Sequence, residues 1–296
     1  ERGVGARARS IDEPAIGDAI YYSGQAIRLA EGRGFVVPFP VGATAPAADH
    51  PPLTALAMTP VSWVFDSSLL AQRLAMAVVG TLTVAGIGVL GRTVSGRGRI
   101  GLLAAGLAAV YPNLWLNDGV VMSESIATLT TVAIFLALYR ARGRYTAGRL
   151  AVIGVLCGVA VLARAESAFL LPFVILPTVW FTSDRSAWQR LGVVALAGVT
   201  AVAVVAPWTA YNLTRFEEPV LLSTNDGLTI LGANCDTTYY GDGVGLWSFA
   251  CPFEVPITTP PPVHEGCEPL PDDAWSCADQ SEVSAAFRKA GIDYVL

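Results

Sequence analysis

The sequence predicts an all-α protein: a polytopic bundle of about six transmembrane helices with extracytoplasmic loops. Hydrophobic residues make up 53% of the 296 residues and charged residues only 15%, whereas a soluble domain has about 25% charged residues. The mean hydropathy is +0.52. Tracts such as 69–90 and 191–207 carry one ionisable residue or none, while 213–296 is rich in Asp, Glu, Pro and Gly. This uneven pattern indicates membrane helices with soluble appendages.

Six tracts approach the roughly 20 apolar residues that a membrane helix needs. They are residues 69–91, 100–116, 124–141, 149–164, 167–182 and 191–211. The connection between the fourth and fifth tracts is very short, so these two are expected to form a tight hairpin. A further apolar helix at 53–65 follows Pro51 and Pro52. It is short for a crossing and suits the membrane interface better.

The arginines predict the orientation of the bundle. They gather after the first, third and fifth tracts: Arg92, Arg97, Arg99, Arg140, Arg142, Arg144, Arg149, Arg185 and Arg190. The alternate connections carry almost no basic residues. Because short cytoplasmic loops carry the excess of Lys and Arg, we expect these three loops inside the cell.

The same orientation divides the chain into three parts. Residues 1–68 form a first extracytoplasmic loop with juxtamembrane helices, 69–212 the bundle, and 213–296 a truncated extracytoplasmic segment with disulfides. A chain that begins outside needs a preceding membrane helix to carry its first residues across. We therefore expect a fragment, with further spans missing at either end.

Four of the five cysteines lie in the last segment: Cys235, Cys251, Cys267 and Cys277. In an oxidising compartment four cysteines suggest two disulfides, with three possible connectivities. Pairing between neighbours, 235 with 251 and 267 with 277, is favoured. A zinc site is the alternative, although the CxxC spacing typical of zinc sites is absent. Cys157 lies in an apolar tract and suits packing.

Three carboxylates lie near the predicted extracytoplasmic ends of helices. Asp18 falls in the first turn of an expected helix, where it either favours the helix dipole or serves a site. Glu124 follows Ser123, a potential N-cap. Like Asp18, it either favours the helix dipole or serves a site. Asp118 is expected to be a solvated loop residue.

Two cationic candidates accompany these carboxylates. Arg164 and Glu166 lie at the turn of the predicted hairpin, where they either pair with each other or Arg164 binds a phosphate. His50 precedes Pro51 and either contacts a phosphate or makes ordinary loop hydrogen bonds.

The order of motifs carries a resemblance. The run is Gly17-Asp18-Ala19-Ile20-Tyr21-Tyr22, His50-Pro51-Pro52-Leu53, Arg73-Leu74, Tyr111-Pro112, Ser123-Glu124-Ser125, Leu162-Ala163-Arg164-Ala165-Glu166, Pro207-Trp208 with Asn212, and Ser223-Thr224-Asn225 with Gly232-Ala233-Asn234-Cys235. It resembles the GT-C membrane glycosyltransferases, in the branch that holds protein O-mannosyltransferases (glycosyltransferase family 39) and lipid A aminoarabinose transferases. The closest similarity is to actinobacterial members, and it covers nearly the whole chain. Ala19, His50 and Tyr211 depart from the Glu, Lys and Arg of that pattern.

The resemblance implies a hexosyl- or pentosyltransferase that moves a sugar from a polyprenyl phosphate to a hydroxyl of a glycan, lipid or protein, with inversion. It implies that Asp18 takes the acceptor proton, and the site role open to Glu124 is to position the acceptor or to act as a second acid. It also implies that Tyr22, His50 and Arg164 bind the donor. No cofactor is predicted, and a divalent metal stays an open alternative.

Two other classes of function remain. A lipid or polysaccharide transporter would need polar residues along a path through the spans, which are nearly free of ionisable groups. A non-catalytic membrane scaffold would not need Asp18 and Glu124 to converge on one cavity. The expected partners are the lipid-linked donor, its acceptor and membrane lipids. Nucleic acid is not expected, because no basic stripe exists. The excess of Arg, with Lys289 the only lysine, suggests a GC-rich genome and therefore a bacterium. The expected location of this multi-pass chain is the plasma membrane.

Overall fold

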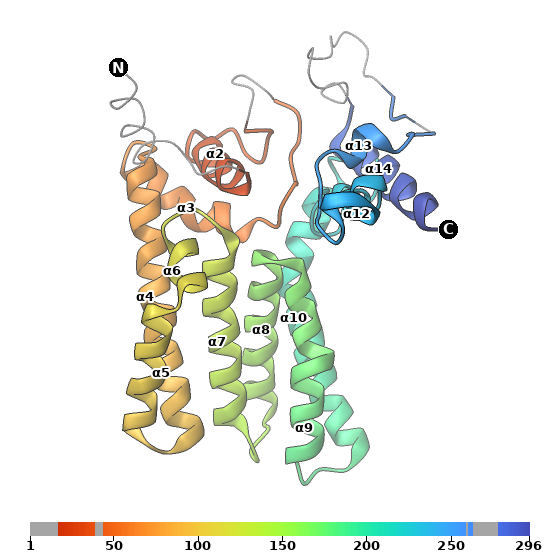
Figure 1. Ribbon diagram of the computed structural model, residues 1–296. Helices are drawn as coiled ribbons and strands as arrows, with labels where there is room; N and C mark the ends of the chain where they lie inside the picture. The colour runs from red at the N-terminus through yellow and green to blue at the C-terminus, as the bar shows by residue number, and fades with distance from the viewer. Residues whose placement is uncertain (1–16, 39–43, 259, 263–277) are drawn as a thin grey trace. The chain divides into compact units, whose positions relative to one another are not determined.

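The computed structural model describes residues 17–38, 44–258, 260–262 and 278–296, which divide into two compact units. The first unit holds residues up to Gly34 and Pro51–Pro207, and the second holds Phe35–His50 and Trp208–Leu296. Helices are the regular secondary structure of the described residues, with one isolated β-bridge between Val36 and Pro46. The predicted all-α class is confirmed (Figure 1).

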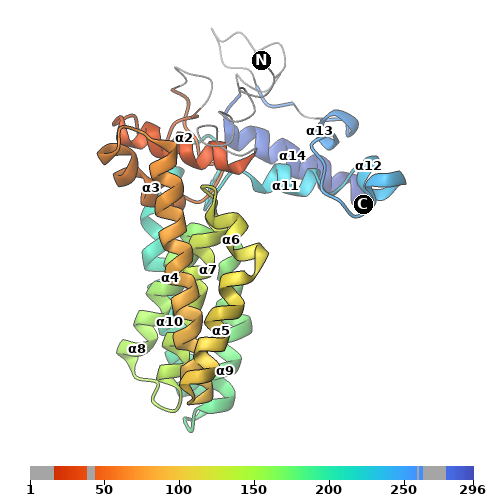
Figure 2. The same ribbon diagram turned by 60° about the vertical axis from the view of Figure 1, so that its left-hand side comes forward.

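The first unit is a bundle with two helices lying at one of its ends. Helices α2 (Asp18–Ala30) and α3 (Leu53–Val64) pack on each other at that end. The bundle itself is formed by α4 (Leu69–Ser95), α5 (Gly98–Val110), α6 (Pro112–Asp118), α7 (Ser123–Ala141), α8 (Ala147–Ala163), η1 (Ala165–Phe169), η2 (Leu171–Ile175), α9 (Leu176–Thr182) and α10 (Ala187–Leu213). Figures 1 and 2 show α4, α5, α7 and α8 running side by side.

Among the described residues, four helical segments are long and apolar enough to cross a membrane: Leu69–Ser95, Ser123–Ala141, Ala165–Thr182 and Ala187–Leu213. A fifth candidate is the pair α5 and α6, bent by 60°. Helix α8 has 17 residues and is about 25 Å long at 1.5 Å per residue, slightly less than the hydrocarbon core. The six predicted spans therefore correspond to four long segments, one bent pair and one short helix. The protein is membrane-embedded.

Proline explains the bend between α5 and α6. Tyr111 precedes Pro112 and has extended backbone angles, φ −78° and ψ 114°. The proline ring disfavours the helical region for the preceding residue, so the helix stops at Val110 and restarts in a new direction. This bend brings α6 back against α4 and α7.

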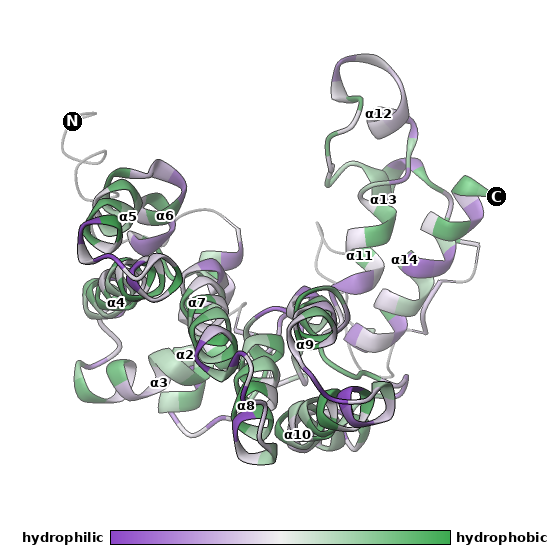
Figure 3. Cartoon of the chain, turned by 90° about the horizontal axis from the view of Figure 1, so that it is seen from below, coloured by the Kyte–Doolittle hydropathy of each residue, from purple (hydrophilic) through white to green (hydrophobic). Residues whose placement is uncertain are grey.

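The interior of the bundle is apolar and closely packed. One buried cluster joins α7, α8, α9 and α10 around Ile134, Ile153, Val179 and Ala197. A Cβ added at Gly154 would lie 2.2 Å from the Ala197 carbonyl oxygen, so α8 and α10 approach closely through small residues, as membrane helices commonly do. Figure 3 shows hydrophobic residues around most of the bundle helices.

The Arg-rich connections share one end of the bundle. Figure 1 shows the turns α4–α5, α7–α8 and α9–α10 together, at the end opposite α2 and α3. This placement follows from antiparallel helices joined by short turns. Arg185 donates to the Tyr145 carbonyl at 2.9 Å and so ties two of these turns together.

The second unit is a small helical subdomain with its own core. It contains α11 (Asp226–Leu231), α12 (Asp236–Tyr239), η3 (Gly241–Gly243), α13 (Cys251–Glu254) and α14 (Gln280–Val295), together with the end of α10 from Trp208. Helix α11 packs closely on α14, because Gly227 lies directly against the Ser284 backbone. Leu231, Cys235, Cys251 and Phe287 are buried between these helices.

Candidate active site

Asp18 is the first residue of α2 and is exposed. Gly17 before it has φ 83°, a left-handed angle that glycine adopts without strain. The placement in the first helical turn agrees with the prediction from the sequence. Asp18 therefore presents a carboxylate at the end of the bundle that carries α2.

Tyr22 lies one turn later and is buried, 2% exposed. Burial raises the pKa of its hydroxyl, and the negative charges of Asp18 and Glu124 act in the same direction. A hydrogen bond with Ser123 and the charge of Arg164 oppose this rise. The phenol therefore stays protonated at neutral pH. Asp18, Glu124 and Arg164 are therefore all close enough to Tyr22 for their charges to influence its hydroxyl.

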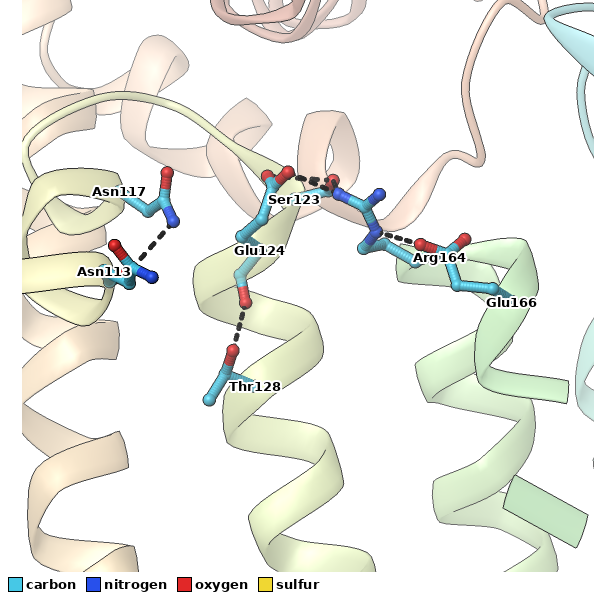
Figure 4. Close-up of polar contacts among 7 residues, drawn as sticks. All are labelled: Asn113, Asn117, Ser123, Glu124, Thr128, Arg164 and Glu166. Carbon is cyan, nitrogen blue, oxygen red and sulfur yellow. Dashed lines mark hydrogen bonds and ion pairs between the residues drawn. The ribbon is translucent and has the colours of Figure 1, made fainter. Parts of the chain in front are cut away.

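Arg164 lies between two carboxylates. Its Nη1 contacts Glu124 Oε1 at 2.5 Å and Ser123 Oγ at 3.3 Å, and its Nε contacts Glu166 Oε1 at 2.5 Å. Arg164 follows the end of α8 with extended backbone, while Glu124 lies in the first turn of α7. Figure 4 shows the guanidinium bridging the two helix ends. The ion pair of Arg164 with Glu166 considered from the sequence is present, and Glu124 joins it.

The three charged side chains of the network around Arg164 are partly exposed. The side chains of Arg164 and Glu124 are 36% and 34% exposed, and that of Glu166 is 58% exposed. Among the described residues, no acceptor is recorded for Nη2 of Arg164, and Figure 4 shows this nitrogen pointing away from Glu124. One N–H edge of the guanidinium is thus available to an oxyanion.

Ser123 has a different role from the N-cap considered from the sequence. The N-cap of α7 is Met122, without a side-chain cap hydrogen bond. Ser123 is buried, accepts from Arg164 and bonds with the Tyr22 hydroxyl. It therefore links α2 to the network around Arg164.

His50 belongs to the second unit, as the last residue before Pro51, and is half-buried. The network around Arg164 lies in the first unit. Its proposed contact with a donor phosphate stays a prediction.

A hollow that the sequence did not reveal lies beside Glu124. It is lined by Thr83 of α4, by Asn113, Leu114, Asn117 and Asp118 of α6, and by Glu124, Ser125 and Thr128 of α7. Seven of these eight residues carry hydrogen-bonding side chains. The sequence signal that could have revealed it is the spacing of Asn113, Asn117 and Asp118, which places three polar groups within two helical turns. Such a group is uncommon beside apolar tracts.

The structure corrects the expectation for Asp118. It is not a solvated loop residue but the last residue of α6, half-buried, and it accepts a hydrogen bond from Ser125 Oγ at 2.7 Å. A Cβ added at Gly80 would overlap its carboxylate. The bend at Pro112 turns α6 inward, so a residue that reads as loop packs against α4.

The cysteine predictions have a mixed outcome. Cys235 and Cys251 form a disulfide, and Cys157 is free and buried. Cys267 and Cys277 lie outside the described residues. Within the described ranges, no group of three or more His, Cys, Asp or Glu is arranged to hold a metal ion.

Comparison with known proteins identifies the family. The profile of the family described as dolichyl-phosphate-mannose-protein mannosyltransferase matches residues 49–211, which is more than half of the chain. The matched range contains His50, Glu124 and Arg164, and it begins after Asp18 and Tyr22. No curated protein and no solved structure matches the chain. The chain belongs to the dolichyl-phosphate-mannose-protein mannosyltransferase family, and it is a membrane glycosyltransferase.

Proposed function

We propose that this chain transfers a sugar from a polyprenyl-phosphate donor to a hydroxyl group, with inversion, at the extracytoplasmic face of the plasma membrane. Membership of the family supports a lipid-linked sugar as the donor. The apolar bundle supports it too, because a polyprenyl chain partitions into the bilayer. The Arg-rich turns lie at the end opposite α2, so the positive-inside rule puts the network around Arg164 outside.

The observation that carries the proposal is the contact of Arg164 with Glu124 and Ser123, next to the buried Tyr22, whose hydroxyl is also influenced by the charge of Asp18. A transferase needs a base and a cationic group at one point, whereas a scaffold does not. The acceptor oxygen forms a bond to the anomeric carbon, and the bond from that carbon to the phosphate oxygen breaks. The bonding electron pair leaves with the phosphate, and the acceptor proton goes to a carboxylate.

Asp18 is the proposed base. It is exposed at the first turn of α2, so an acceptor hydroxyl can reach its carboxylate. Asp18 has the position of the acidic residue in the motif that resembles the GT-C enzymes. Glu124 is the second carboxylate of the site and faces both Arg164 and the hollow.

Arg164 is the proposed partner of the phosphate. The leaving phosphate gains negative charge as the glycosidic bond breaks, and a guanidinium stabilises that charge through N–H donors aimed at the oxygens. The Nη2 edge supplies such donors. Tyr22 contributes a neutral hydroxyl beside it, and His50 is proposed as a further phosphate contact.

The test is Asp18→Asn in the full-length protein. The amide is nearly isosteric but takes no proton at neutral pH, so transfer should slow by about 10²–10⁴-fold while donor affinity stays within a few-fold. The measurement is sugar transfer from polyprenyl-phosphate mannose by purified protein in lipid nanodiscs, with thermal stability recorded. If Asp18 acts only on the helix dipole, Asn serves almost as well, and a rate near that of the wild type removes Asp18 as the base.

A further inference from the structure

We propose that the turns α7–α8 and α9–α10 together bind the headgroup of an anionic phospholipid. Two helical segments long and apolar enough to cross a membrane, Ala165–Thr182 and Ala187–Leu213, meet at the second of these turns. A turn that joins two membrane helices lies at the depth of the lipid headgroups. The leaflet concerned is the one at the Arg-rich end of the bundle, which the positive-inside rule makes cytoplasmic.

Two hydrogen bonds hold the two turns together. Tyr145 is buried in the α7–α8 turn, and its hydroxyl lies 2.6 Å from Thr182 Oγ1 at the end of α9. Arg185 Nη2 donates to the Tyr145 carbonyl at 2.9 Å. Figure 3 looks onto this end of the bundle and shows hydrophilic residues between α9 and α10. The two turns therefore form one polar surface at the end of the bundle.

This surface carries positive charge that the protein does not balance. Within 142–149 and 183–190, Asp184 is the single carboxylate, and the sequence places five arginines there: Arg142, Arg144, Arg149, Arg185 and Arg190. Among the described residues, no ion pair is recorded for any of these five. Anionic lipids are attracted to clusters of basic residues next to membrane helices.

Arg190 is the side chain best suited to a lipid phosphate. It is half-buried in the first turn of α10, and its Cζ lies 5.5 Å from the centroid of the Trp180 ring. Its Nε is buried, and in the part of the chain that the structure describes no acceptor is recorded for this guanidinium. A buried N–H without an acceptor is costly. A phosphate, which a guanidinium binds through two parallel hydrogen bonds, would supply the missing acceptor.

Exposed apolar side chains beside the turns favour a lipid over a free phosphate. Phe181 and Trp188 flank the α9–α10 turn and are 84% and 83% exposed. Leu191 is also exposed and follows Trp188 by three residues, so the two lie on one face of α10. Aromatic side chains gather where membrane helices reach the headgroups. Acyl chains can cover these side chains, whereas a free phosphate would use none of them.

The experiment measures the binding of dioctanoyl phosphatidylglycerol to the full-length protein in a neutral detergent. Dioctanoyl phosphatidylcholine, which has no net charge, and inorganic phosphate are the comparison ligands. Arg190→Gln removes the charge, and Arg190→Lys keeps it without the forked geometry. Arg99→Gln is the control, because Arg99 is an exposed arginine at the same end of the bundle that follows the α4–α5 turn.

The expected result is a preference of the wild type for phosphatidylglycerol that depends on Arg190. Loss of one arginine near the membrane surface should weaken this binding by about fivefold in Arg190→Gln, with a smaller loss in Arg190→Lys. Binding of phosphatidylcholine should stay unchanged, and Arg99→Gln should match the wild type. Thermal unfolding of each variant checks the fold. If Arg190→Gln does not fold, Arg142→Gln, at an exposed position in the α7–α8 turn, replaces it.

Three results would overturn the proposal. Equal binding of phosphatidylglycerol and phosphatidylcholine by the wild type means that no anionic headgroup is recognised. Equal losses in Arg190→Gln and Arg99→Gln, or no loss in either, mean that only the overall charge of this end matters, or that it does not matter. Inorganic phosphate that binds as tightly as phosphatidylglycerol means that the site takes a free anion and not a lipid.

Discussion

Two half-buried arginines, one in each unit, hold segments together by different chemistry. Arg164 in the first unit pairs with the carboxylates of Glu124 and Glu166. Arg215 in the second unit donates to the backbone carbonyls of Phe35 and Ala47, at 2.6 and 2.7 Å. It also donates to Asn212 Oδ1 at 2.9 Å.

The surroundings of the two guanidiniums differ as well. Aromatic rings enclose Arg215, with the Tyr211, Phe216 and Trp208 ring centroids 4.4, 4.7 and 5.3 Å from its Cζ. These rings attract a cation without carrying a charge. The recorded hydrogen-bond acceptors of Arg215 are neutral as well. Arg164 has instead two charged partners, and its Nη2 edge is open.

The difference separates a structural arginine from one suited to chemistry. A guanidinium that donates to backbone carbonyls and packs among aromatic rings mainly fixes the backbone at Phe35 and Ala47. A cation held by two partly exposed carboxylates can exchange one of them for another anion, because surface ion pairs are weak. Substitution of Arg164 should therefore change activity, and substitution of Arg215 should change stability.

The largest expected effect is that of Arg164→Ala on transfer. Loss of one group that stabilises a developing oxyanion typically costs about 10²–10³-fold in rate. Stability should change by no more than about 1 kcal/mol, because the three side chains are partly exposed. Arg164→Lys keeps the charge but not the forked geometry, and should recover only part of the rate. Purified protein with polyprenyl-phosphate mannose gives the rates, and a wild-type rate in Arg164→Ala would refute the role.

The next effect concerns the disulfide of the second unit. Cys235 and Cys251 are separated by 16 residues, so in the chain-entropy model their link contributes about 3 kcal/mol. Replacing both by Ser should raise amide hydrogen exchange in α12 and α13. Cys157→Ala in α8 is the control and should leave that exchange unchanged. Recovery of unmodified wild-type Cys235 and Cys251 as free thiols, by alkylation without reductant and mass spectrometry, would contradict the bond.

Much of the fold could be predicted from the sequence because hydrophobic length and charge are local signals. The apolar tract after Ser68 predicts α4, and Ser68 caps that helix through a hydrogen bond from the Ala71 amide. The first-turn position of Asp18 could also be predicted from a local signal, because it depends only on Gly17 and on the helical spacing of the apolar residues that follow. The hairpin turn at Arg164 follows from two apolar tracts separated by a few polar residues.

The rest of the site depends on packing between helices, which the sequence does not display. Nothing local to Asp118 indicates that Gly80, many residues earlier, leaves room for its carboxylate. The contact of Arg164 with Glu124 likewise joins residues 40 positions apart. The role of Arg215 is hidden in the sequence for the same reason, because its acceptors at Phe35 and Ala47 lie 180 and 168 positions away. Sequence periodicity identifies the helices, but these contacts depend on how the helices and loops are arranged in space.

The smallest expected effect is that of Arg215→Lys, and it tests whether geometry or charge matters in the second unit. Lysine keeps the charge and its attraction to the rings, but a single ammonium cannot reach two carbonyls and Asn212 with the forked geometry of a guanidinium. We expect a loss of about 1–2 kcal/mol, from one or two hydrogen bonds left unmade. The readout is amide exchange at Val37 and Ala47, whose amides donate to the carbonyls of Ala45 and Phe35. Arg33→Lys is the control, because Arg33 is half-exposed and pairs with Glu31. Unchanged exchange at both amides in Arg215→Lys would mean that the positive charge alone is enough to hold Val37 and Ala47 in place. Arg215 and Arg164 would then differ in the groups that they contact and not in their use of the guanidinium geometry.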